Sequence, residues 1–103
     1  DIPEPAQNLI QIAYIRALAE QLKFIEIIHR GKEVRMKLQD NRALSPRVLM
    51  IIVNENQKIL RLVGSNPPMI ILRIKEDSGM EALSASIGIL EKIKDLQESE
   101  IKV

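Results

Sequence analysis

The sequence predicts an α+β domain in which helices pack on a largely antiparallel sheet, in the order helix, β-hairpin, helix, β-hairpin, helix. Residues 24–39 and 58–75 each hold two short apolar, β-branched runs around a turn, which is typical of hairpins. Residues 5–22 and the segment from residue 78 onward have apolar residues at three- and four-residue intervals, which is typical of helices. At 103 residues the chain is long enough for one core, so we expect a single domain over residues 1–103.

The first helix is predicted over residues 5–22, because neither Gly nor Pro interrupts it after its first residue. Its polar residues do not gather on one broad face. We therefore expect two of its sides to be covered, with Ala13, Ala17 and Ala19 allowing a close approach across a sheet.

The first hairpin is predicted from strands at residues 24–30 and 33–39. Gly31 supplies the positive φ that a two-residue hairpin turn requires at its first central position. In the second strand apolar residues alternate with Arg35 and Lys37, so we expect one face of this strand to meet water.

The segment after the first hairpin is predicted to be a short helix ending near Asn54. Its many β-branched residues would also suit a strand. Ser45-Pro46 favours the helix, since serine caps a free N–H and proline fits the first helical position.

The second hairpin is predicted from residues 58–63 and 69–75, joined by the turn-forming loop 64–68. Residues 69–75 are apolar on both sides, so we expect the sheet to be covered on both faces near its centre.

The last helix begins after Ser78, which forms a capping box with Glu81. One apolar stripe follows along it: Ala82, Leu83, Ile87, Ile89, Leu90, Ile93 and Leu96.

The residue inventory argues against an enzyme. There is no Cys and a single His, which excludes thiol chemistry, disulfides and His/Cys metal clusters. Ser45 and Ser78 are better explained as helix caps than as nucleophiles, and loop 64–68 lacks the Gly-Lys-Ser/Thr ending of a phosphate loop. We expect neither catalysis nor a cofactor.

No apolar run approaches the length of a membrane span, and the opening residues do not form a signal peptide. We therefore expect a soluble, cytoplasmic domain cut from a longer chain.

The first helix also carries a family resemblance over residues 2–22. This segment resembles the entry to the carboxy-terminal domain of bacterial transcription-repair coupling factor, in which Pro, apolar, Arg and Ala residues follow a set spacing. The matching residues are Pro3, Leu9, Ile10, Ile12, Ala13, Arg16, Ala19 and Leu22. Lys23 departs from the pattern, because the family often has glycine there, which would make the helix exit differ. The remaining elements match the family in order only.

The resemblance implies most of a non-catalytic regulatory domain of a longer multidomain protein. The parent would be an ATP-driven translocase on double-stranded DNA that acts on stalled RNA polymerase and recruits the excision-repair machinery. Its carboxy-terminal domain would pack on an amino-terminal module similar to excinuclease B. That contact would be autoinhibitory, since it masks the surface that recruits excinuclease A, and its release would be a switch between two arrangements.

Two sets of candidate contact residues follow. For protein interaction they are Arg16 on the first helix and, on the last helix, Glu91, Lys94, Asp95 and Glu98. Arg16 could instead lay its stem along apolar surface or pair with a buried carboxylate, and the charges of the last helix could be only a solvated face. The alternative function is a small nucleic-acid-binding module using the first hairpin: Arg30, Lys32, Arg35 and Lys37. The even charge balance and the lack of aromatic residues count against it.

Overall fold

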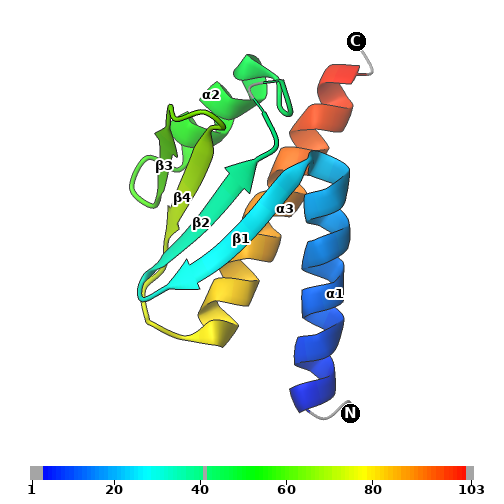
Figure 1. The fold of residues 1–103 in the computed structure, drawn as a ribbon, viewed down its shortest axis with the longest axis vertical. Helices are drawn as coiled ribbons and strands as arrows, with labels where there is room; N and C mark the ends of the chain where they lie inside the picture. Colours follow the sequence, from blue (N-terminus) through cyan, green and yellow to red (C-terminus); the bar gives the residue numbers. More distant parts are fainter. Residues whose placement is uncertain (1–3, 41, 102–103) are drawn as a thin grey trace.

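The computed structural model describes residues 4–40 and 42–101, and in this part of the chain three helices pack on a four-stranded antiparallel sheet (Figure 1). The predicted α+β class and element order are confirmed. The elements are α1 (Glu4–Leu22), β1 (Phe24–Arg30), β2 (Glu33–Leu38), α2 (Pro46–Glu55), β3 (Leu60–Val63), β4 (Met69–Arg73) and α3 (Gly79–Ile101). Strand boundaries differ from the predicted ones by at most two residues, and the segment after Ser45 is the predicted helix.

The sheet has the order β1-β2-β4-β3, so the two hairpins lie side by side with β2 and β4 in the centre. Helices α1 and α3 run in the same direction along one face of the sheet (Figure 1). Helix α2 packs against α3 and β3 at the other end of this layer. Between sheet and helices lies a core whose fully buried members include Met36, Ile52, Ile70, Leu72, Leu90 and Ile93.

The opposite face of the sheet is open. No helix of the described chain packs on it, so the expectation of a sheet covered on both faces is wrong. Ile71 belongs to this open face and is nevertheless only 8% exposed. In the strand register it lies between Arg35 and Arg61, whose long stems can shelter an apolar neighbour without a second layer.

Helix α1 buries one side, not the predicted two. Leu18 and Leu22 enter the core, and Ala19 is buried as expected. Ala13 and Ala17 are exposed, because α1 is the last helix of its layer and packs mainly on α3 and β1.

The turns follow their local chemistry. Gly31 has a φ of 56°, as the first hairpin requires. Lys23 has a φ of 65°, so it takes the left-handed conformation that glycine favours, and the helix exit keeps that backbone form despite the lysine. Ser45 Oγ accepts a hydrogen bond from the Arg47 amide at 3.2 Å.

Helix α3 starts with half of the predicted capping box. The Glu81 amide donates to Ser78 Oγ at 3.4 Å, but the Ser78 amide donates to the Glu76 carbonyl at 2.9 Å instead of to the Glu81 side chain. The predicted apolar stripe is confirmed, since all of its members are buried or half-buried.

Candidate protein-interaction site

Exposed apolar side chains gather on α1 and β1. Leu9 is 68% exposed and Ile10 is 56% exposed, so both side chains are mostly in water. We call the following set the α1–β1 edge: Leu9, Ile10, Ile12, Tyr14, Ile25 and Ile28. Six of the ten large apolar side chains that the described chain exposes thus belong to these two elements.

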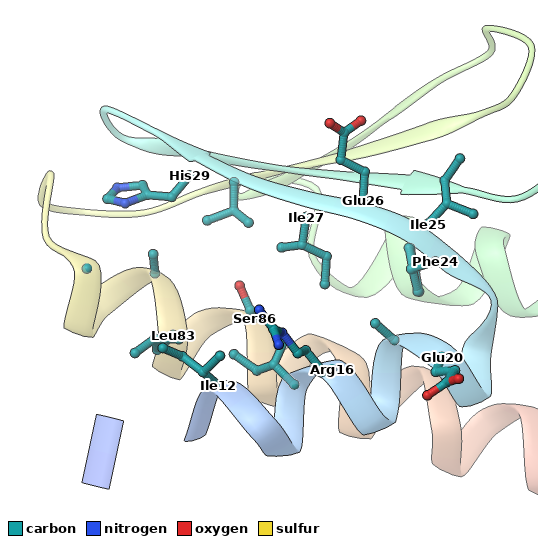
Figure 2. A pocket seen from close by; sticks show the side chains of 15 residues that line it. Ile12, Arg16, Glu20, Phe24, Ile25, Glu26, Ile27, His29, Leu83 and Ser86 are labelled. Atoms are coloured by element: carbon teal, nitrogen blue, oxygen red, sulfur yellow. The ribbon is translucent and has the colours of Figure 1, made fainter. Parts of the chain in front are cut away.

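A groove of about 720 Å³ lies between α1 and β1, which form its walls, and the first turns of α3 form its floor (Figure 2). It exists because α1 passes directly into β1 through the left-handed Lys23, after which the two elements diverge (Figure 1). Most of its lining is apolar: Ile12, Ile15, Phe24, Ile25, Ile27 and Leu83. Ser86 lies on its floor and is 2% exposed.

Strand β1 presents an unpaired backbone to this groove. The two-residue turn makes Arg30 and Glu33 the closing hydrogen-bonded pair of the hairpin. Alternation along β1 then directs the N–H and C=O groups of Ile27 and His29 away from β2. The hydrogen bond from the Leu38 amide to the Pro68 carbonyl, 3.0 Å long, lies on the far side of β2. It agrees with this assignment, because successive residues of β2 form their backbone bonds on alternate sides of the strand. Since β1 is an end strand of the sheet, no strand of the described chain pairs with these groups.

Arg16 is the predicted contact residue that the groove contains. Its side chain extends from α1 into the groove, towards Ser86 (Figure 2). Among the described residues no carboxylate forms an ion pair with it, and Glu20 of the next turn points away (Figure 2). Arg16 is itself exposed, and no buried carboxylate among the described side chains pairs with it.

The candidate residues of α3 lie on the other flank of α1. Tyr14 Oη donates a hydrogen bond to Glu91 Oε2 at 3.0 Å. This bond raises the pKa of Tyr14 above 10.0, with smaller contributions from desolvation and from the charges of Glu91 and Asp95. Residues Tyr14 and Arg16 are about 200° apart around a helix, so the α3 carboxylates and the groove are separate features.

Lys94 and Glu98 complete the predicted set on α3. Lys94 is half-buried and Glu98 is exposed. Neither lines the groove, so the structure does not bring the predicted contact residues together into one site.

The alternative candidates lie elsewhere. Arg30, Arg35 and Lys37 project from the open face of the sheet, whereas Lys32 lies in the hairpin turn. The structure adds Arg61 and Arg73, which share this face through the pairing of β2, β4 and β3. Sequence reasoning missed these two, although they alternate with apolar residues as Arg35 and Lys37 do.

Ion pairs on this open face are long. Arg35 lies 3.8 Å from Glu33, and Lys37 lies 3.9 Å from Glu26. Exposed pairs of this kind contribute little to stability, so these cations remain available to a partner.

The described residues contain neither a metal-binding cluster nor a membrane-spanning helix. No group of three or more His, Asp or Glu residues there could hold a metal ion. Within the same residues, no helix has the length and apolar character needed to cross a bilayer.

Comparison with known proteins agrees with the resemblance in the first helix. The family model of the TRCF domain matches residues 1–49, which include α1, the first hairpin and the start of α2. No curated protein matches the chain, and neither does any solved structure. The predicted resemblance is confirmed: over residues 1–49 the chain is similar to the TRCF domain of transcription-repair coupling factors.

Proposed function

We propose that this chain is the non-catalytic regulatory domain at the carboxy terminus of a transcription-repair coupling factor. In this proposal it packs on the amino-terminal, excinuclease-B-like module of the parent and masks the surface that recruits excinuclease A. The observation that carries the proposal is that the exposed apolar α1–β1 edge lies entirely on elements that the TRCF domain model matches.

The character of this edge supports a contact that opens and closes. Fully burying a side chain such as Leu9 or Ile10 contributes about 1.5–3 kcal/mol, so a few of them give a modest interface once the cost of association is deducted. Charged residues such as Arg16 and Glu20 flank the apolar ones. Domain interfaces of this mixed type within one chain separate reversibly, as a switch in recruitment requires.

A binding measurement in trans tests the proposal. We expect the 103-residue chain to bind the amino-terminal module of a bacterial coupling factor with micromolar affinity by calorimetry, because no tether raises the effective concentration. The double variant Leu9→Glu, Ile10→Glu should weaken binding tenfold or more, since it places charges in an apolar contact.

A competition assay tests the masking step. We expect the chain to reduce capture of excinuclease A by the module. The matched control is Met50→Glu, which alters an equally exposed apolar residue on α2, outside the α1–β1 edge. Absence of binding at high micromolar concentration and low salt would overturn the proposed function.

One observation favours the second candidate, a nucleic-acid-binding module. The open face of the sheet gathers five cationic residues: Arg30, Arg35, Lys37, Arg61 and Arg73. Only Glu26 and Glu33 oppose them on β1 and β2. Such a face would bind phosphates without sequence preference, and affinity would fall steeply with salt. Binding of a DNA duplex at about 50 mM salt that Arg35→Glu abolishes would support this candidate, and no binding at that salt would remove it.

A further inference from the structure

We propose that the groove between α1 and β1 receives an extended polypeptide segment that adds to β1 as a fifth strand and pairs one carboxylate with Arg16. The segment is apolar at alternate positions. That it belongs to the amino-terminal module rests on the proposed function, whereas the recognition chemistry rests on the groove itself.

The backbone of β1 favours an extended strand over a helix as the segment bound in the groove. Ile27 and His29 direct unpaired N–H and C=O groups along the groove. A helix lying there would cover these groups without bonding them, which costs binding energy. An extended segment placed one strand spacing away would bond them all, as in other cases of strand addition to a sheet edge.

The lining of the groove selects apolar side chains at every second position. A strand beside β1 would direct alternate side chains to the helix layer, as β1 itself does with Ile27. These side chains would meet Ile12 and Leu83, which line the groove from α1 and α3. The intervening side chains would point to the open face of the sheet and meet water.

Arg16 favours a negative charge on the bound segment. Its guanidinium reaches into a mostly apolar groove and has no ion-pair partner among the described residues (Figure 2). A carboxylate from the bound strand would supply a bidentate partner, and displacement of water would strengthen the pair. Glu20, one turn further along α1 on the same wall, disfavours a second carboxylate towards that end of the groove.

The groove chemistry is tested with a phage-displayed library of random twelve-residue peptides, selected on the 103-residue chain. We expect enriched sequences to share one Asp or Glu with apolar residues at alternate positions. A synthetic peptide of the enriched sequence should slow hydrogen exchange at the amides of Ile27 and His29 about tenfold or more. Changing its acidic residue to the amide should weaken binding by about tenfold or more, the usual effect of losing a charge-assisted hydrogen bond.

Protein variants assign the charge to Arg16. Arg16→Ala should lose as much affinity as the amide peptide, and the two changes together should cost little more than either alone. Arg16→Lys should lose less, since it keeps the charge but not the planar fork. Arg61→Ala is the matched control, because it removes an exposed arginine from β3 at the far end of the sheet and should leave affinity unchanged. Failure to enrich any peptide, binding that ignores Arg16, or amide protection elsewhere on the chain would overturn the inference.

The same Arg16 variants and exchange measurement on the complex with the amino-terminal module separate the two proposals. Peptides that bind the groove while the module does not bind the chain would refute only the proposed function. If the module binds the Arg16→Ala variant as tightly as the original chain and leaves the amides of Ile27 and His29 unprotected from exchange, only the assignment of the groove would be refuted.

Discussion

Helices α1 and α3 lie side by side and run in the same direction, yet they use their apolar residues differently (Figure 1). Leu90 and Ile93 of α3 are 0% exposed, whereas Leu9 and Ile10 of α1 face solvent. Helix α3 has α1 on one side and α2 on the other, and α1 ends the layer. Position in the layer therefore decides what each helix buries. Helix α3 places its apolar residues in the core, whereas α1 leaves several of its own exposed.

Truncation of matched residues on the two helices should give the largest contrast. We expect Leu90→Ala to lower the free energy of unfolding by about 2–5 kcal/mol, because it leaves a cavity in the core. Ile10→Ala should change it by less than about 0.5 kcal/mol, since this side chain is mostly in water. Urea denaturation measures both. Equal losses would mean that the outer side of α1 is already covered in the free protein, which would remove the comparison.

The contrast between the helices also separates the features that the sequence predicts from those that it does not. The apolar stripe of α3, the Gly31 turn and the Ser45 cap were predictable, because each depends on residues within a few positions of one another. The one-sided burial of α1 was not, because it depends on which neighbour the helix lacks. That Arg16 lacks an ion pair could not be predicted for the same reason, since it depends on where the carboxylates of the other described elements lie.

The open face of the sheet likewise depends on contacts between elements that are distant in the sequence. Alternation placed Arg35 and Lys37 on a wet face, but only the pairing of the two hairpins through β2 and β4 brings Arg61 and Arg73 beside them. That pairing has no local signature. The apolar content of β4 suggested a second covering layer, whereas long neighbouring side chains suffice to shelter Ile71.

The start of α3 should show a smaller effect than its core. Ser78→Ala removes the oxygen that accepts the Glu81 amide, so we expect a loss of about 1 kcal/mol in the free energy of unfolding. Ser84→Ala is the control on the exposed side of the same helix, where alanine should be neutral or slightly stabilising. Equal effects of the two substitutions in urea denaturation would show that the Ser78 cap does not hold the helix start.

The end of α1 should respond in the opposite direction. Lys23 has a left-handed backbone, which costs a residue with a Cβ atom more than it costs glycine. Lys23→Gly should therefore stabilise the protein by about 0.5–1 kcal/mol, seen as a higher Tm. The converse change, Gly31→Ala, should lower the Tm. A Cβ atom at Gly31 would meet nothing within 4 Å, so any loss there comes from the φ of 56° alone. Destabilisation by Lys23→Gly would show that the left-handed backbone at α1's exit carries no strain.

The contact that joins α1 to α3 should give the smallest change, and Tyr14 reports it directly, because the chain has one Tyr and no Trp. The hydrogen bond to Glu91 favours the protonated phenol, so phenolate absorbance should appear with a midpoint above pH 10.0. Because the pKa is raised on folding, the stability this bond contributes is fully present below about pH 10 and is lost as pH rises through the folded-state value. Glu91→Gln should move the midpoint down towards 10.0, and Glu98→Gln, further along α3, should leave it in place. A midpoint that ignores Glu91→Gln would place the Tyr14 hydroxyl in water and leave α1 attached to α3 by apolar packing alone, which would make α1 freer to shift when a partner covers its outer side.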